Sequence, residues 1–290
     1  MTDLFEQYPI STQTLIISTN LLIDCQQFYD SIHPVIVSRP PVGKNRMLVQ
    51  TVDQIEDGQI VFAQYKNSYK GMIFKKISEK YFLNSVTVIM KIANKFINIK
   101  VSNKGKLQIT GCSRTEYAVT ILKQFWSMIR AQKPIWSFQE DTQFKASIIP
   151  VMCNINFSID FQINRESLNH IINTRTDYIS ILEPSDGYVG VNIKISTEEE
   201  PLENILLDQY IYDGKEWKKS YVKFIDYIQT LSLKEQKKKI AKCFVNTFLV
   251  FYSGKVIMSG GISYVNRKRA YETFMNIIQQ YREEIVATFP

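Results

Sequence analysis

The chain has 290 residues, of which 45% are hydrophobic and 22% charged, a balance that favours a globular protein and excludes a disordered one. A net charge of +7 and a pI near 9.0 favour a polyanionic partner without requiring one. Four well-separated cysteines predict buried thiols in a reducing compartment, and the lack of a long apolar run or signal-peptide pattern predicts a protein that is neither secreted nor membrane-bound.

The first half of the chain begins with a strand and ends with a long helix. In chain order we expect a strand (13–23), a short helix (25–32), an irregular segment (34–80) that contains a hairpin of short strands (58–65 and 71–76), a strand (85–92), a hairpin (96–111) and a long helix (113–130). Asp24 is the expected cap of the first helix, and Ser113 with Glu116 forms the expected capping box of the second.

The second half shows the same order of elements. We expect a strand (151–163), a helix capped by Asn164 (165–174), a strand (188–195), an insertion (196–241), a hairpin (247–261) and a long helix (263–285). Within the insertion we expect a turn at 212–214 and two helices at 219–231 and 234–244. The lysines of the second helix are read as a solvated face, with phosphate or partner contact as the alternative.

The order of elements and the spacing of two Gly-Lys turns indicate an internal duplication. Gly105 and Gly254 are 149 positions apart, and so are Gly111 and Gly260. We therefore predict a first repeat over 1–145, with an insertion at about 34–80, and a second repeat over 146–290, with an insertion at about 196–241. Together they would form one α+β domain.

Strict alternation along the strands divides each sheet into a core face and an open face. Val86, Val88, Met90 and Ile92 alternate with Ser85, Thr87, Ile89 and Lys91, and the strand from Val151 alternates in the same way. Helices can cover one face of such a sheet, so the second face is open or bound to something. Its Asn, Ser, Thr, Gln and Lys residues suit a nucleic-acid surface, although solvent exposure alone would produce much of this composition.

These residues resemble the TATA-box-binding protein family, particularly the divergent versions encoded by large DNA viruses. The segment LVFYSGKVIMSGG (249–261) is similar to the family's LIFxSGKVVLTGA, and EPSDGYVGVNIKI (183–195) to its EPxxFPGLIYRM. In the first half, SVTVIMKI, GKLQITG and LIISTNL resemble FAAVIMRI, GKMVCTG and IVSTVNL. The resemblance implies a saddle, in which two pseudo-symmetric repeats form one curved antiparallel sheet with helices on the convex side. The concave face would lie in a widened minor groove.

The resemblance also implies roles for individual residues. Phe251 and Tyr188 match apolar wedges that unstack base steps, whereas Ser85 and Ser102 stand where the family has phenylalanines. We therefore expect asymmetric or shallower DNA bending, or loading by a partner. The other implied DNA contacts are Leu249, Ile257, Ser259, Thr110, Gln108, Asn154, Lys91, Lys106, Lys194 and Lys255. Glu183 and Pro184 begin the implied partner-binding loop, and Leu15 replaces an asparagine of the first repeat.

The expected function is that of a monomeric, non-enzymatic transcription initiation factor. It would bind the minor groove of AT-rich double-stranded DNA and recruit a TFIIB-like initiation factor and RNA polymerase, in the nucleus or in a cytoplasmic viral factory, with packaging in the virion as a further option. No catalytic motif, metal-ligand spacing or cofactor motif appears, so no metal or cofactor is expected. The alternatives are a protein-interaction scaffold with little DNA bending, and an architectural protein that coats DNA without sequence preference.

Overall fold

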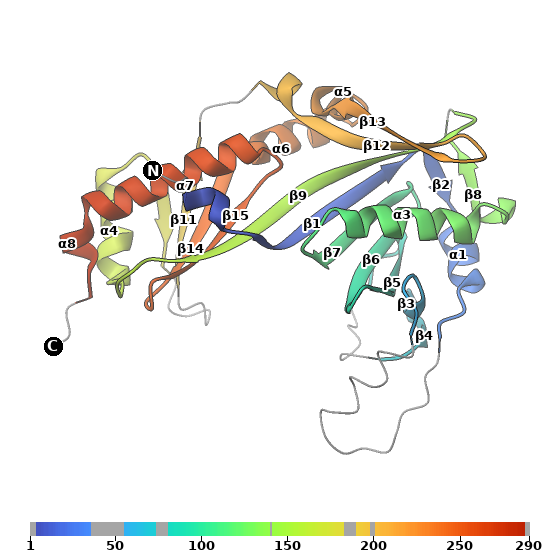
Figure 1. Cartoon of the computed structure of the whole chain (residues 1–290), viewed down its shortest axis with the longest axis horizontal. Coiled ribbons are helices and arrows are strands. Elements are labelled where there is room, and N and C mark those ends of the chain that lie inside the picture. The colour runs from blue at the N-terminus through green and yellow to red at the C-terminus, as the bar shows by residue number, and fades with distance from the viewer. Residues whose placement is uncertain are drawn as a thin grey trace, which may run out of the picture. The chain divides into compact units, whose positions relative to one another are not determined.

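Strands that bury every second residue form the framework of the protein (Figure 1). The computed structural model describes residues 4–35, 55–73, 81–139, 141–182, 190–197 and 201–287. The chain divides into an N-terminal unit, Thr14–Ile149 with Leu207–Tyr221, and a C-terminal unit, Met1–Gln13 with Pro150–Leu206 and Val222–Pro290. Each unit has a hydrophobic core of its own.

The N-terminal unit contains a sheet in the order β1-β7-β6-β5-β3-β4, with a helix against one face. The pairs β3–β5, β5–β6 and β6–β7 are antiparallel, and Figure 1 shows α3 crossing in front of the strands of this sheet. The elements are β1 (Ile10–Thr19, begun in the other unit), β2 (Leu21–Ile23), α1 (Cys25–Ser31), β3 (Ile60–Tyr65), β4 (Ser68–Gly71), β5 (Ser85–Ile92), β6 (Lys95–Ser102), β7 (Lys106–Cys112), α3 (Glu116–Ile129), η2 (Lys133–Ile135), β8 (Trp136–Phe138), the first part of β9 (Phe144–Ser158), β12 (Leu206–Tyr212) and β13 (Trp217–Lys223).

The C-terminal unit contains an antiparallel sheet in the order β10-β11-β14-β15-β9. The long helix α7 packs against the core side of these strands (Figure 1). Its elements are η1 (Leu4–Gln7), the second part of β9, α4 (Arg165–Arg175), β10 (Ile179–Ile181), β11 (Gly190–Ser196), η4 (Leu202–Asn204), α5 (Phe224–Gln229), α6 (Leu233–Cys243), β14 (Val245–Phe251), β15 (Lys255–Gly260), α7 (Tyr264–Gln280) and α8 (Arg282–Ile285).

The predicted α+β class is confirmed within each unit, and most of the predicted core positions are buried. The inward residues of β5, β6, β7, β11 and β14 are at most 2% exposed. Val151 is an exception, because it is exposed at the middle of β9 although the alternation places it in the core. The predicted saddle concerns the placement of the two units relative to each other and stays a prediction.

Side-chain caps begin α1, α4 and α7. Asp24 accepts from the backbone N–H of Gln27 at 3.0 Å, Asn164 from that of Ser167 at 3.1 Å, and Ser263 from that of Asn266 at 3.0 Å. The first two confirm the predicted caps of α1 and α4. The predicted Ser113 cap is wrong: β7 continues through Cys112, the turn occupies residues 113–115, and α3 begins at Glu116 without a side-chain cap.

The segment predicted as the first insertion supplies a strand of the sheet itself. The predicted strand at 58–65 corresponds to β3, which pairs with β5 as β10 pairs with β11 in the other unit. Its hairpin partner β4 covers Ser68–Gly71 rather than 71–76, and residues 74–76 lie outside the described part of the chain. β3 therefore occupies the place in this sheet that β10 occupies in the C-terminal unit.

The second predicted insertion contains a hairpin where a helix is expected. The turn at 212–214 is confirmed, with the Asp213 carboxylate accepting from the backbone N–H groups of Lys215 and Glu216 at 3.0 Å. The helix predicted over 219–231 is wrong in its first half, since β13 pairs with β12 and α5 covers only Phe224–Gln229. The Trp217 ring, 5.6 Å from that of Phe144, ties this hairpin to the core of the N-terminal unit.

The two Gly-Lys hairpins share the same backbone geometry. Gly105 and Gly254 both have a positive φ, 65° and 77°, which glycine adopts without strain. The N–H of each glycine donates to the carbonyl oxygen of the residue three positions earlier at 3.0 Å. The carbonyl oxygen of Gly105 accepts from the backbone N–H of Thr19, in β1, at 3.1 Å. The carbonyl oxygen of Gly254 accepts from the backbone N–H of Ile159, just after β9, at 2.8 Å. These matched bonds support the internal duplication.

Candidate nucleic-acid interface

A polar row crosses the C-terminal unit on the face of the sheet that does not pack against α7. The register places Lys194 beside Thr247, Thr247 beside Ser259, and Ser259 beside Asn154. The Ser259 hydroxyl donates to Oδ1 of Asn154 at 2.8 Å. None of the four side chains is buried. The structure therefore brings Lys194, Ser259 and Asn154 together on the open face, as the sequence predicts.

An apolar strip lies next to this row. Leu249 pairs with Ile257, and Asn192 and Asn156 flank them on the neighbouring strands. Both aliphatic side chains are half-buried, although they lie on the face away from the core. Apolar contacts to base edges accompany hydrogen bonds when a protein reads a groove, so an aliphatic strip between amides suits such a surface.

Phe251 lies at the end of β14, beside the turn of the hairpin. Its side chain is half-buried, and the residue directly opposite is Gly190. A Cβ atom at Gly190 would stand 2.8 Å from Cδ1 of Leu249, so this glycine makes room for its neighbour. Lys255 follows the turn, exposed and opposite Ser158. This end of the hairpin thus presents an aromatic ring and a cation.

Three predicted positions of the second repeat cannot be placed on this face. Tyr188, the predicted partner wedge, lies outside the described residues, as do Glu183 and Pro184 of the predicted partner-binding loop. Their roles stay predictions.

The open face of the N-terminal unit is more polar at the corresponding positions. Thr110 lies opposite Asn98, and Gln108 lies opposite Lys100. At the hairpin end, Ser85 lies directly opposite Ser102. The Ser102 hydroxyl accepts from the backbone N–H of its near neighbour Lys106 at 3.1 Å, so it helps to hold the turn. Both serines are half-buried, and neither offers an apolar surface.

The prediction that Lys91 lies on this open face is wrong. Its side chain is 8% exposed, and its ammonium group donates to the backbone carbonyl of Ile55. The segment before β3 covers this end of β5, where the Lys91 backbone exchanges hydrogen bonds with Gly58 and Gln59 at 2.8 and 3.0 Å. A lysine held in this way is not available to a phosphate.

Leu15, which the resemblance places where the family has an asparagine, does not lie on the open face. Leu15 is fully buried in the core of the N-terminal unit. Its neighbours Thr14 and Ile16 alternate with it and are half-buried. They, rather than Leu15, lie on the side of β1 away from the core.

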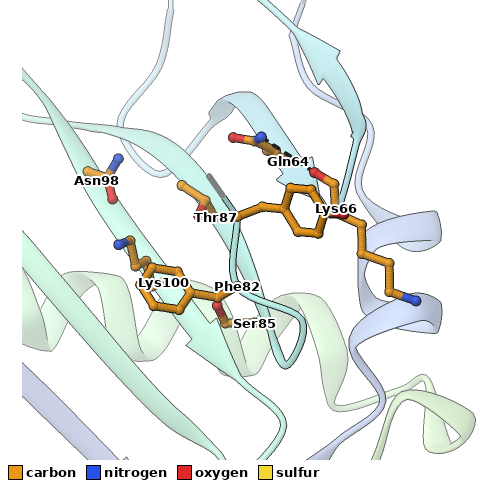
Figure 2. Close-up of a pocket in the computed structure, with 8 residues that line it drawn as sticks. Gln64, Lys66, Phe82, Ser85, Thr87, Asn98 and Lys100 are labelled. Atoms are coloured by element: carbon orange, nitrogen blue, oxygen red, sulfur yellow. Dashed lines mark hydrogen bonds between the residues drawn. The ribbon is translucent and has the colours of Figure 1, made fainter. Parts of the chain in front are cut away.

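Sequence reasoning missed an aromatic segment beside the open face of the N-terminal unit. Tyr81 and Phe82 line a hollow of about 350 Å³ together with residues of β3, β5 and β6, and Figure 2 shows Phe82 beside Ser85 and Lys100. The Nζ atom of Lys100 lies 4.4 Å from the centre of the Phe82 ring. The available signal was the run of three large apolar residues at 81–83, directly before a polar pair and a strand.

The open faces carry mainly positive charge. Lys100 and Lys106 lie on the face of the N-terminal unit, and Lys194 and Lys255 on that of the C-terminal unit. Asp160, exposed just beyond β9, is an acid that the alternation assigns to the same side. A surface dominated by lysines attracts a polyanion and makes its binding dependent on salt.

Three cysteines, Cys25, Cys112 and Cys153, are buried core residues, as the sequence predicts. Burial, with the nearby Asp24 charge, raises the pKa of the Cys25 thiol to about 11, and burial also raises the pKa of Cys153. In the part of the chain that the structure describes, no three His, Cys, Asp or Glu side chains gather as metal ligands would. Nor does any described helix combine the length and apolar character needed to cross a membrane.

Comparisons with known proteins identify viral relatives, although no family model matches the chain. Uncharacterized protein 335L of Invertebrate iridescent virus 6 is 29% identical over 232 residues, which cover 78% of this chain and 68% of that protein. A TATA-box-binding protein-like protein of Acanthamoeba polyphaga mimivirus is 31% identical over 146 residues, 43% of this chain and 40% of that protein. A solved structure, the TBP of Methanococcus jannaschii, aligns with a TM-score of 0.42 and 14% identity, covering 94% of this chain and 98% of that one. The chain is thus similar in sequence to a viral TATA-box-binding protein-like protein, and the resemblance indicated by its motifs is confirmed.

Proposed function

We propose that the chain is a TATA-box-binding-protein-like transcription initiation factor that binds the minor groove of AT-rich promoter DNA. Its role is non-enzymatic: it marks the promoter and recruits a TFIIB-like initiation factor and RNA polymerase. The open faces of both units contact the DNA. The observation that carries this proposal is the polar row of the C-terminal unit beside the strip of Leu249 and Ile257.

The chemistry of this face fits the floor of a minor groove. Ser259 and Asn154 are joined by a hydrogen bond of 2.8 Å, in which the amide oxygen accepts. The NH₂ group of the same amide is then the part that donates to adenine N3 or thymine O2, the acceptors that A·T pairs show in this groove. A G·C pair adds an amino group there, which would meet the aliphatic strip, and AT-rich steps deform more easily. Both effects favour AT-rich sites.

The proposal assigns phosphate contacts to three lysines. Lys106 is half-buried, and Lys194 and Lys255 are exposed. Each neutralised phosphate contributes about −0.9 to the slope of log affinity against log salt concentration, so these lysines predict a slope of about −3. The burial of Lys91 removes one contact from the predicted set.

Binding of the purified protein to matched AT-rich and GC-rich duplexes, followed by fluorescence anisotropy over a range of salt concentrations, tests the proposal. We expect tighter binding to the AT-rich duplex and the slope given above. A protein-free duplex labelled in the same way controls for salt effects on the dye. Negligible binding to both duplexes, also with initiation-factor partners present, would contradict DNA reading. Salt-dependent binding without AT preference would indicate the architectural alternative.

The partner contacts and the site of action belong to the same proposal. We assign the recruiting surface to the loop that begins at Glu183 and Pro184, and the place of action to the nucleus or a cytoplasmic viral factory. We propose that the protein acts as a monomer. Co-purification from cells that express the tagged protein tests the partners, and loss of polymerase from a Glu183→Arg variant that still binds DNA is the expected result.

A second candidate function is a protein-interaction scaffold in a viral transcription or virion complex. The observation that favours it is the Ser85–Ser102 pair, which leaves the N-terminal hairpin without an apolar wedge. A scaffold keeps its protein partner when Phe251 is changed to alanine and shows no change in DNA binding. An initiation factor loses DNA affinity or bending in the same variant.

A further inference from the structure

Two exposed apolar side chains precede β5. Phe82 is 62% exposed and Leu83 is 65% exposed, and the adjacent Tyr81 is 40% exposed. Large apolar groups that face water together often mark a surface that a partner covers.

The segment is tied to the hairpin end of the sheet. The backbone N–H of Asn103, in the β6–β7 turn, donates to the carbonyl oxygen of Asn84 at 3.0 Å. Ser85 then pairs with Ser102 as β5 begins. Phe82 therefore lies just before the start of β5, close to the two serines that lack an apolar surface.

The surroundings of Phe82 are polar and basic. Its ring lines the hollow shown in Figure 2, whose described lining has no acid and consists of Gln64, Lys66, Tyr81, Phe82, Ser85, Thr87, Asn98 and Lys100. The Lys100 ammonium group lies 4.4 Å from the ring centre, a cation–π contact that holds the ring beside the strand. An aromatic ring among lysines and amides is the arrangement by which proteins combine stacking on bases with attraction to phosphates.

We propose that Phe82, supported by Leu83, is the apolar wedge of the N-terminal unit and inserts against a base step of bound double-stranded DNA. The wedge comes from the segment before β5 instead of from the paired strand positions Ser85 and Ser102. This inference rests on the proposed function. Proteins that bind the minor groove insert Phe or Leu side chains between base steps, and the partly unstacked step kinks the duplex. Lys100, beside the ring, supplies the charge that attracts the adjacent backbone.

The experiment compares binding and bending by the full chain and its variants. An AT-rich duplex carries 2-aminopurine at each candidate step in turn and a donor–acceptor dye pair at its ends. The variants are Phe82→Ala, Leu83→Ala, the double variant and the conservative Phe82→Leu. Leu233→Ala is the matched control, because Leu233 on α6 is 75% exposed and belongs to the C-terminal unit.

Removal of the wedge is expected to weaken binding roughly tenfold in the double variant, since stacking of an aromatic side chain on a base contributes this much or more. The 2-aminopurine signal at one step and the bend angle are expected to fall with it. Phe82→Leu keeps most of the effect, and Leu233→Ala binds like the unchanged protein. Circular dichroism checks that the variants remain folded, which their exposure predicts.

Other outcomes separate the failure of this inference from the failure of the proposed function. If the unchanged protein binds the AT-rich duplex but Phe82→Ala and the double variant bind and bend it equally well, the wedge is refuted and the proposed function stands. Loss of a protein partner from the double variant, with DNA binding intact, also refutes the wedge and assigns the segment to a protein contact. No binding of any AT-rich duplex by the unchanged protein refutes the proposed function itself.

Discussion

The two hairpins have the same backbone and different chemistry at their ends. In both turns a glycine with a positive φ donates its N–H to the carbonyl oxygen of the residue three positions earlier at 3.0 Å. On the open face, however, the C-terminal hairpin pairs Phe251 with Gly190, whereas the N-terminal hairpin pairs Ser102 with Ser85. The turn is fixed by backbone geometry, while the face is free to change without affecting the fold. Conservation of a hairpin within a duplicated protein therefore does not imply that both copies do the same work.

The comparison is tested most strongly at the turn glycines. A Cβ atom on Gly254 would stand 2.5 Å from the carbonyl oxygens of Ile159 and Phe161, and one on Gly105 would overlap the carbonyl oxygen of Leu21. Together with the positive φ, this predicts that Gly254→Ala and Gly105→Ala each lower the free energy of unfolding by about 2–3 kcal/mol. Urea denaturation measures the change.

Gly214→Ala is the matched control for the turn glycines. Gly214 also has a positive φ, 101°, but no atom lies within 4 Å of a Cβ placed there. Gly214→Ala should therefore lower the free energy of unfolding only by the cost of the left-handed backbone conformation, about 1 kcal/mol. Equal losses of unfolding free energy at the two hairpin glycines, both larger than at Gly214, would support the structural equivalence of the hairpins. A loss at only one of the two hairpin glycines would contradict it.

The difference between the hairpin faces predicts unequal effects on DNA. Phe251→Ala is expected to weaken binding to an AT-rich duplex roughly tenfold, because an aromatic ring at a base step is lost. Ser102→Ala, at the matching position of the other hairpin, should change affinity less than twofold. Anisotropy titrations measure both affinities. Similar losses from the two variants would show that the serine contributes as much as the phenylalanine and would contradict the asymmetry.

The alternation of the strands was predictable because a period of two depends only on neighbouring residues. It placed Asn154, Thr110 and Lys194 on the open faces, whereas the role of Ser259 was implied by the family resemblance. Lys91 follows the same alternation but is covered by Ile55, which is 36 positions earlier in the chain, and no local pattern reports such a contact. β13 was predicted as a helix for a similar reason, since its strand conformation depends on pairing with β12.

The candidate site was predictable where a residue acts from a strand and not where it acts from a connecting segment. Phe251 is fixed by the register of β14, so its motif indicated its position. Phe82 lies outside any strand, and its place beside Lys100 depends on the Asn84–Asn103 hydrogen bond across the hairpin end. The exposure of its ring is visible only in three dimensions.

Charge changes at the lysines should separate phosphate contacts from structural lysines. Lys255→Gln and Lys106→Gln are each expected to reduce the salt slope of DNA binding by about 0.9, because each removes one phosphate contact. Lys91→Gln should leave the slope unchanged and instead lower the stability of the N-terminal unit, since its ammonium group donates to the Ile55 carbonyl. A change in slope for Lys91→Gln would show that the buried position opens when DNA binds.

A loss of stability confined to high pH is expected from the buried thiols of both units. Burial raises the pKa of Cys25 from its ordinary value of 9.0 to about 11 in the folded N-terminal unit, and burial also raises the pKa of Cys153 in the C-terminal unit. Because the unfolded thiol ionises first, the contribution of Cys25 is complete below pH 9 and is lost as the pH rises from 9 to 11. Denaturation midpoints of Cys25→Ala and Cys153→Ala between pH 7 and 11 should therefore decline less steeply above pH 9 than that of the unchanged protein. A parallel decline in all three would show that neither thiol is linked to unfolding, whereas a shallower decline in one variant alone would show that only one unit governs it.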